Sequence, residues 1–401
     1  MTAPRRASQL LLTDLKKLLL IVVLLPILAA MGWWYFYERE LPSFAPAYRE
    51  YAYVSNSKSN TVSVIDVRTF EPVKTIKVGS EPVTLAANSK KNEIYVVNAA
   101  SSNITVIDAE HNEVTATIEV HGKPVSIEVS GDGRRAYVVT SAGTICLVDL
   151  EKRTVVGNIR VGNSPAQAKA SADGRTVVVT NRGGGSVSLI DSRTLAVRNT
   201  IPVCKQPQAV TVLPDSSKAF VACAGSAQVA SIDLKNDKLL TLLDVGEGPS
   251  DIVAKPDGGE VIVCNSGSNS ISMIESAMDE VNGSYLIGNH PARGVVTDDS
   301  SRFMVSNSAS NSVAVYDIDL GKIIAVLPVG SHPDALALSQ SQNYLMVLNS
   351  ESGDITVIQK RRPRKLEPTE YSLLTMIPVG MHPTNIVVKS FMLGAPPKQT
   401  H

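Results

Sequence analysis

Aromatic residues are scarce in this chain. They make up 5% of its 401 residues, and both tryptophans, Trp33 and Trp34, stand near the N-terminus. Carbohydrate and single-stranded nucleic-acid sites rely on aromatic faces for stacking, so the rest of the chain offers little for either. The net charge is zero, because 38 basic residues balance 38 acidic ones. We therefore expect no nucleic-acid partner.

Cysteine is almost as scarce, with four residues: Cys146, Cys204, Cys223 and Cys264. They show neither C-x-x-C nor C-x-x-C-H spacing, which argues against a zinc site and covalent haem. Cys223 and Cys264 fall on corresponding strands of adjacent units of the repeat described next. Packed sheets lie about 10 Å apart, whereas a disulfide needs Cα atoms within about 7 Å. We expect four free, mostly buried thiols.

Long stretches with the 3.6-residue period of a helix are also missing from the repeat region. What is present is a repeat with a period of about 42 residues. Its clearest mark is a hydrophobic-Gly-x-x-Pro turn, degenerate in two copies. The eight prolines are Pro82, Pro124, Pro165, Pro207, Pro249, Pro291, Pro333 and Pro383, spaced 42, 41, 42, 42, 42, 42 and 50 residues apart. A fixed period of this length, built from short alternating strands, predicts a β-propeller.

Each repeat predicts four short strands rich in Val, Ile and Thr, separated by turns such as Asp132-Gly133. The repeat region opens on a second strand at Tyr51 and ends on a first strand after Pro383. The last strand can therefore complete the first sheet and bring Ile386 close to Val54, which removes an exposed sheet edge. We predict one all-β domain, an eight-bladed propeller closed by the C-terminal strand; seven blades is the alternative if a terminal unit fails to pack.

The repeat resembles a known family. Tyr95-Val96-Val97-Asn98, the following Asn103 to Asp108 and the Val-Gly-x-x-Pro turn are similar to the YVTN-repeat β-propellers, which include surface-layer-type proteins. The resemblance covers roughly residues 51–390 and implies the propeller fold. Related propellers include lactonases and domains that hold haem d1, so the fold alone does not supply the function.

The N-terminus predicts a membrane anchor. Residues 18–37 carry no charge, and this segment is long enough for a transmembrane helix. The basic residues before it predict that residues 1–17 lie in the cytoplasm. The residues Trp33, Trp34 and Tyr35 would mark the outer interface. A cleaved signal peptide is the alternative. Residues 38–50 would form a linker, 51–390 the propeller, and 391–401 a flexible tail, with the propeller in the periplasm or outside the cell.

The loops divide the propeller into two faces. The Val-Gly-x-x-Pro loops and the loops after the second strands share one face, which we call the top; the linker arrives at the other, the bottom. One insertion on the bottom is basic and contains Lys360, Arg361, Arg362, Arg364 and Lys365. It could dock on anionic lipid or on an acidic partner, or be a solvated loop.

Three histidines share one position of the repeat on the top face: His290, His332 and His382, in the loops entering blades 7, 8 and 1. They are candidate ligands, but neighbouring loops about 10 Å apart do not converge on one metal, and we expect no metal site. Inner strands contribute Asp251, Arg293 and Asn385 as channel candidates. Opposite charges on adjacent blades, such as Glu128 with Lys169 and Asp251 with Arg293, more simply pair with one another.

An aspartate recurs at the end of the third strand of six units, which indicates a turn-stabilising role. The chain shows no Ser/His/Asp constellation, no P-loop and no dinucleotide fingerprint. Our main hypothesis is a non-catalytic interaction module without a cofactor, acting as an accessory subunit of a membrane or envelope complex with partner proteins. The alternative is a lactonase-like or haem-d1-related propeller that uses the central channel around Asp251, Arg293, Asn385 and the three histidines. A structural envelope protein is a third possibility.

Overall fold

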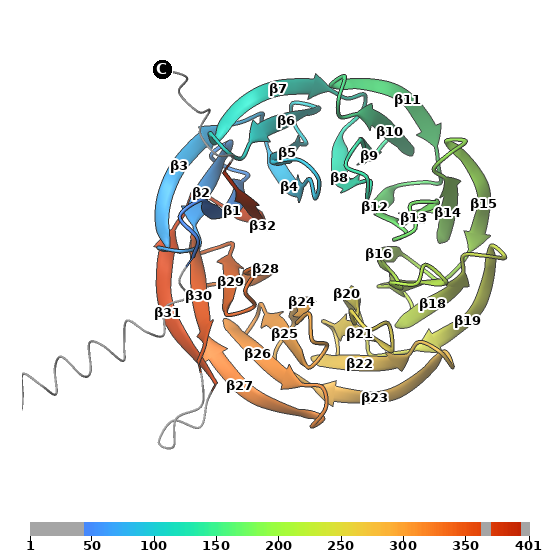
Figure 1. Ribbon diagram of the computed structural model, residues 1–401. Helices are drawn as coiled ribbons and strands as arrows, with labels where there is room; N and C mark the ends of the chain where they lie inside the picture. The colour runs from blue at the N-terminus through green and yellow to red at the C-terminus, as the bar shows by residue number, and fades with distance from the viewer. Residues whose placement is uncertain (1–43, 362–369, 394–401) are drawn as a thin grey trace, which may run out of the picture. The chain divides into compact units, whose positions relative to one another are not determined.

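The computed structural model describes residues 44–361 and 370–393. The chain divides into two compact units, Met1–Tyr48 and Arg49–His401, and the second forms the fold described here. That unit is all-β, and the described residues contain no helix. Eight four-stranded sheets, the blades, are arranged in a ring (Figure 1).

Each blade has an inner, a second, a third and an outer strand. The inner strands are β4 (Pro82–Ala87), β8 (Pro124–Val129), β12 (Pro165–Ala170), β16 (Pro207–Val212), β20 (Pro249–Ala254), β24 (Pro291–Val296), β28 (Pro333–Leu338) and β32 (Pro383–Met392). The second strands are β1 (Tyr48–Asn56), β5 (Glu93–Asn98), β9 (Arg135–Thr140), β13 (Thr176–Asn181), β17 (Lys218–Cys223), β21 (Glu260–Asn265), β25 (Arg302–Asn307) and β29 (Tyr344–Asn349).

The third strands are β2 (Thr61–Asp66), β6 (Asn103–Asp108), β10 (Thr144–Asp149), β14 (Ser186–Asp191), β18 (Gln228–Asp233), β22 (Ser270–Glu275), β26 (Ser312–Asp317) and β30 (Asp354–Lys360). The outer strands are β3 (Glu71–Lys77), β7 (Glu113–Glu119), β11 (Thr154–Arg160), β15 (Ala196–Pro202), β19 (Lys238–Asp244), β23 (Glu280–Leu286), β27 (Lys322–Pro328) and β31 (Tyr371–Pro378). Blade 1 consists of β32 and β1 to β3, and blades 2 to 8 follow in chain order.

The ring closes as predicted. The first sheet has the order β3-β2-β1-β32, so the C-terminal strand completes the sheet that the first strand begins. Val54 and Ile386 belong to one buried cluster, and the hydroxyls of Ser55 and Thr384 lie 2.8 Å apart. The prediction of eight blades is confirmed, and the seven-bladed alternative is wrong.

The glycine of the Val-Gly-x-x-Pro loop has a steric role. In blade 4, a Cβ on Gly162 would lie 2.6 Å from the side chain of Asn181, the last residue of β13. The backbone N–H of Gly162 donates to Oδ1 of Asn181 at 3.0 Å, and Nδ2 of Asn181 donates to Ser188 at 3.0 Å. Gly380 and Asn56 repeat this pairing in blade 1. The absence of a side chain on the glycine thus makes room for an asparagine that ties the loop to its blade.

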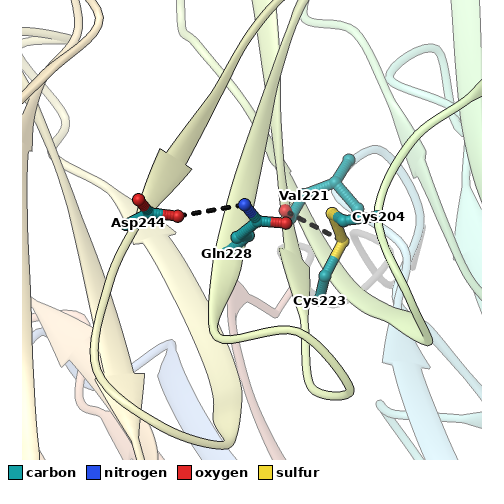
Figure 2. The surroundings of a disulfide bond; sticks show 5 residues. All are labelled: Cys204, Val221, Cys223, Gln228 and Asp244. Carbon is teal, nitrogen blue, oxygen red and sulfur yellow. Dashed lines mark hydrogen bonds between the residues drawn. A yellow bond between two sulfur atoms is a disulfide. The ribbon is translucent and has the colours of Figure 1, made fainter.

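Blade 5 replaces this glycine–asparagine pair by two cysteines. Cys204 takes the position of the glycine and Cys223 that of the asparagine, and they form a disulfide with a Cα–Cα distance of 5.8 Å (Figure 2). Our expectation of four free thiols is therefore wrong for this pair. That expectation considered only cysteines on neighbouring blades, whereas Cys204 and Cys223 meet at the top of one blade. Cys146 and Cys264 are free and buried.

The recurring aspartates cap turns, as expected. Oδ1 of Asp66 accepts the backbone N–H of Arg68 at 2.9 Å, and Oδ1 of Asp191 accepts that of Arg193 at 2.9 Å. The pKa of the Asp191 carboxyl is lowered, mainly by the hydrogen bond from the backbone N–H of Thr194. In six of the eight blades, the turn before the outer strand is thereby held by an aspartate of the blade itself.

Several predicted features lie outside the described residues: the anchor at 18–37 with Trp33, Trp34 and Tyr35, and the basic residues Arg362, Arg364 and Lys365. Of the basic insertion, the described part holds Lys360, at the end of β30, and Arg361, whose Nε donates to Gln359 at 3.4 Å. Within residues 44–361 and 370–393, no helix is long and apolar enough to cross a membrane.

Candidate functional site

The inner strands form the wall of a central channel that water reaches. The side chains of Lys169 and Arg293, on β12 and β24, expose 44% and 52% of their surface although both lie on inner strands. Each is paired with the preceding blade: Lys169 lies 3.4 Å from Glu128, and Arg293 lies 3.6 Å from Asp251. The carboxylate of Asp251 raises the pKa of Arg293. The opposite charges therefore pair across blades, as the sequence indicated.

The inner wall also contains a set of backbone caps. An inner strand is an edge strand, so some of its N–H groups point away from its own sheet and need another acceptor. At four successive blade junctions a side chain of the preceding blade supplies it. The pairs are Glu128 to Ala170 N (3.1 Å), Gln167 to Val210 N (2.9 Å), Thr211 to Ala254 N (3.3 Å) and Asp251 to Gly294 N (3.0 Å).

These caps occupy only half of the ring, from blade 3 to blade 7. At the other four junctions, no described side chain accepts an N–H of the next inner strand. The residues at the corresponding positions are Arg293 and Val295, Ala335 and Ala337, Asn385 and Val387, and Thr84 and Ala86. Most of them are apolar or, like arginine, can only donate. We call the two parts the capped half (junctions 3/4 to 6/7) and the bare half (junctions 7/8 to 2/3).

The three predicted histidines stand where the bare half begins at the top. His290, His332 and His382 directly precede the prolines of β24, β28 and β32, and all three are exposed. Each has a positive φ, of 57°, 55° and 53°. Histidine tolerates this left-handed conformation better than most residues, and asparagine does so too.

Each histidine ring is held by a serine of its own blade. The distance from Nδ1 to the serine Oγ is 2.9 Å for His290 and Ser308, 3.1 Å for His332 and Ser350, and 3.2 Å for His382 and Ser57. The same serine hydroxyls donate to the histidine carbonyls, at 3.1, 3.1 and 3.0 Å. Each histidine carbonyl also accepts the backbone N–H of the same serine at 3.0 Å, so the hydroxyl can either accept from Nδ1 or donate to it. When Nδ1 is the donor, Nε2 carries a lone pair, the state in which histidine ligates a metal.

A pocket adjoins one of these rings. It has a volume of about 470 Å³, lies between blades 8 and 1 on the top face, and is lined by Lys58, Glu351, Met381 and His382 among others. A thioether, an imidazole and an ammonium group thus border one pocket. These groups can ligate a metal centre and hold an anionic group.

The three imidazoles do not form one bare-metal site. Within the part of the chain that the structure describes, no group of three or more His, Cys, Asp or Glu side chains could hold a metal ion. Each histidine is anchored to its own blade instead. Asn385 lies on the inner strand β32, and its Oδ1 is buried without a hydrogen-bond partner.

Sequence reasoning found the histidines but missed their serines and the caps. The serine follows the last residue of the second strand, as in Asn307-Ser308 and Asn349-Ser350. Its pairing with histidine occurs in blades 7, 8 and 1, whereas in blade 6 Ser266 faces Gly248. Aligning the repeats by both loops would have shown this correlation.

Comparison with known proteins gives a partial family match. The family model described as the Cytochrome D1 heme domain matches residues 87–218, about a third of the chain, in blades 2 to 5. Curated protein sequences give no match. The matched model is a different propeller family from the YVTN repeat, whose resemblance remains compatible with the fold.

Solved structures confirm the fold. The chain is similar to "Dihydro-heme d1 dehydrogenase NirN in complex with DHE", with a TM-score of 0.68 and 14% identity over 84% of this chain and 74% of that one. It is similar to Kuenenia stuttgartiensis hydrazine synthase, with a TM-score of 0.53 and 18% identity over 78% and 95%. A functionally unknown protein from Desulfotomaculum acetoxidans gives a TM-score of 0.58 and 15% identity over 84% and 98%.

Proposed function

We propose that the protein is a membrane-anchored, extracytoplasmic propeller that holds a haem-type cofactor at the top of its channel, beside blades 7, 8 and 1. The observation that carries the proposal is the set of three identical histidine–serine pairs, each of which fixes an exposed ring through Nδ1 and leaves Nε2 without a hydrogen-bond partner among the described residues. The partial match to the haem d1 domain supports the same cofactor class. This replaces the cofactor-free interaction module as our first hypothesis.

The residues fit such a group better than they fit a bare ion. A haem brings four nitrogen ligands in its own ring, so the protein needs to supply only one or two. Single imidazoles that do not converge satisfy that need. His332 or His382 would hold the iron, Met381 lies in the same pocket as His382, and Lys58 would pair with a carboxylate of the cofactor. The bound iron would supply redox chemistry at this site.

The proposed location agrees with the cysteine chemistry. A disulfide between Cys204 and Cys223 is typical of proteins outside the reducing cytosol. The uncharged residues 18–37 would anchor the chain, and the basic residues around Lys360 would contact anionic lipid or an acidic partner. Both statements stay proposals.

The test is an absorption titration of the purified protein with haem d1 and with protohaem. Binding should shift the haem absorption band. The variants His290→Asn, His332→Asn and His382→Asn keep the positive φ, and at least one should lose the shift. Glu81→Asn is the matched control, since Glu81 has the same loop position with φ of 56° in blade 2. If no histidine variant differs from this control, the proposal is wrong.

A second candidate, the interaction module, is favoured by the outer surface. Among the described residues, the outer strands and preceding turns of blades 5 to 8 expose ten large apolar side chains, whereas those of blades 1 to 4 expose three. The ten are Leu240, Leu242, Met278, Tyr285, Leu286, Leu320, Ile323, Val326, Leu373 and Met376. Exposed apolar side chains that gather on one side of a protein favour a binding surface for a partner. A partner recovered from solubilised membranes should be lost with Leu286→Lys and kept with Val114→Lys.

A further inference from the structure

We propose that the top face binds the top face of a second copy of this chain, so that two propellers stack about a two-fold axis. This interaction surface goes beyond the proposed cofactor site and does not depend on it. The charged side chains at the top carry the inference. They are distributed unevenly around the ring although the net charge of the chain is zero. An uneven distribution of both signs allows one surface to complement itself.

The sign of the charge at the top changes from blade to blade, counting histidine as neutral. In blades 1, 3 and 4 the top loops and the top ends of the outer strands carry only basic residues: Lys58, Lys77, Lys123, Arg160 and Arg182. In blades 2, 6 and 8 they carry only acidic residues: Glu81, Glu119, Glu247, Glu351 and Asp354. All are exposed except the half-buried Glu81 and Asp354. Lys123 lies 3.2 Å from Glu81, whereas Lys205 of blade 5 and Glu247 have no ion-pair partner among the described residues.

The order of the blades decides which of them meet in a stack. Two rings placed face to face run in opposite directions, so the numbers of opposed blades add up to a constant. When blade 1 lies opposite blade 2, the other opposed blades are 3 and 8, 4 and 7, and 5 and 6 (Figure 1). A two-fold axis imposes each pairing in both directions. This alignment places the basic blade 1 on the acidic blade 2, and the basic blade 3 on the acidic blade 8.

Opposite charges then meet at equivalent positions of the repeat, which lie at the same distance from the channel. Lys77 and Glu119 are the last residues of the outer strands β3 and β7, in blades 1 and 2. Lys205 and Glu247 share the third position of the loops that enter blades 5 and 6. Arg182 of blade 4 faces blade 7, which has no charged residue at its described top. Each of these contacts occurs twice in the dimer.

The presence of both signs favours a second copy over other partners. An anionic lipid surface or a nucleic acid would be attracted by blades 3 and 4 but repelled by blades 2, 6 and 8. A second copy satisfies both parts of the face at once. Exposed charge pairs contribute little affinity singly, but their arrangement selects the alignment.

The alignment also agrees with the predicted membrane anchor. In both copies the first strand, β1, belongs to blade 1, which lies opposite blade 2 of the other copy. The two chains therefore enter the stack on the same side. The two-fold axis runs between blades 1 and 2, so it can stand upright on one membrane with both anchors in it.

The experiment reverses one pair of opposed charges. Lys205→Glu and Glu247→Lys each replace attraction by repulsion at two symmetry-related contacts. Sedimentation velocity of the full chain without cofactor, in mild detergent, gives the dissociation constant of the dimer. The wild type should dimerise at about 0.05 M salt and more weakly at about 0.5 M, because salt screens exposed charges. Each reversal should raise the dissociation constant about tenfold or more.

The matched control is Lys235→Glu, an equal change of charge at an exposed residue on the bottom of blade 5. It should leave the dissociation constant within about twofold of wild type, since distant charges are screened. If the wild type is monomeric at low salt, or if the control weakens the dimer as much as Lys205→Glu does, the inference is wrong.

A rescue distinguishes this alignment from any other dimer. The double variant Lys205→Glu with Glu247→Lys restores opposite charges and should dimerise within about threefold of wild type. An equal mixture of the two single variants should form a mixed dimer for the same reason, although each variant alone dimerises poorly. Failure of the mixture to associate would also overturn the inference. The haem titration decides the proposed function separately, because Lys205 and Glu247 lie outside the pocket at His382.

Discussion

The capped and bare halves of the ring are built from the same repeat but differ in how they treat their inner edges. In the capped half, Glu128, Gln167, Thr211 and Asp251 each bind an N–H of the next blade, and two of them also take part in ion pairs. This half also contains the disulfide. In the bare half, alanine or valine stands at five of the eight corresponding positions, and the histidine–serine pairs of blades 7, 8 and 1 lie on the top face of this half.

The difference shows how little is needed to cap an inner edge. In the capped half, one side chain per junction protects the edge strand of the next blade. In the bare half, five of the eight corresponding positions carry alanine or valine. Repeat proteins make such a division visible because each position has seven internal controls. The predictions below test it, beginning with the largest expected effect.

Removal of the disulfide should destabilise the capped half most. The bond spans 19 residues, and a loop of that size contributes about 3 kcal/mol. Cys204→Ala with Cys223→Ala should lose this amount in the free energy of unfolding, measured by denaturant titration. Cys204→Gly with Cys223→Asn restores the pair found in blades 1 and 4 and should recover part of it. Equal losses of stability in both double variants would contradict the view that the disulfide replaces a glycine–asparagine pair at the same position of the repeat.

Loss of one acceptor in the capped half should come next. Asp251→Ala leaves the N–H of Gly294 uncapped and Arg293 without its carboxylate. Because Arg293 is half exposed and screened by water, we expect a cost of about 2 kcal/mol rather than that of a fully buried pair. Asn385→Ala at the same repeat position removes a side chain whose Oδ1 has no partner, and should cost less than about 0.5 kcal/mol. Equal costs by thermal unfolding would remove the distinction between the halves.

Much of the fold followed from the sequence, and less of the site. The spacing of the prolines and the position of Tyr51 relative to Pro383 were enough for eight blades and for the closure through β32, because the repeat determines both. The disulfide was missed because a Cys–Cys pair was not compared with the glycine–asparagine pair that it replaces. The caps were missed for another reason. Which N–H groups of an inner strand point away from the sheet depends on a register irregularity after the proline, as between Pro249 and Asp251, that periodicity does not show.

The serines of the bare half should affect binding without affecting stability. In Ser350→Ala, Nδ1 of His332 loses its hydrogen-bond partner, so the ring is no longer held in place. Loss of such an orienting partner weakens metal binding by about tenfold or more. If His332 holds the iron, the haem titration should show that loss while the melting temperature stays within 2 °C or so, roughly 0.5 kcal/mol. Ser266→Ala in blade 6, where Gly248 replaces histidine, is the control and should bind haem like wild type.

Acid should loosen the capped side of the bottom face first. An aspartate caps the turn between inner and second strands in blades 3 to 7, at Asp132, Asp173, Asp215, Asp257 and Asp299, and each has a lowered pKa. In Asp299 the hydroxyl of Thr297 is the main cause and lowers the pKa to about 2. The corresponding turns of blades 2 and 8 contain Lys90 and Ser341.

The sign follows from these lowered values. A carboxyl with a lowered pKa stabilises the folded state at pH values above its unfolded pKa of 3.8, and the contribution is lost as the pH falls toward 2. Amide hydrogen exchange at pH 4 and pH 2.5, corrected for the intrinsic rate, should therefore show faster opening of the turns in blades 3 to 7. The turns of blades 2 and 8 should keep their protection. The effect is small because these carboxyls are largely exposed, so it should appear as local exchange rather than as unfolding. Uniform loss of protection around the ring would instead mean that acid acts on the whole propeller and not through these turns.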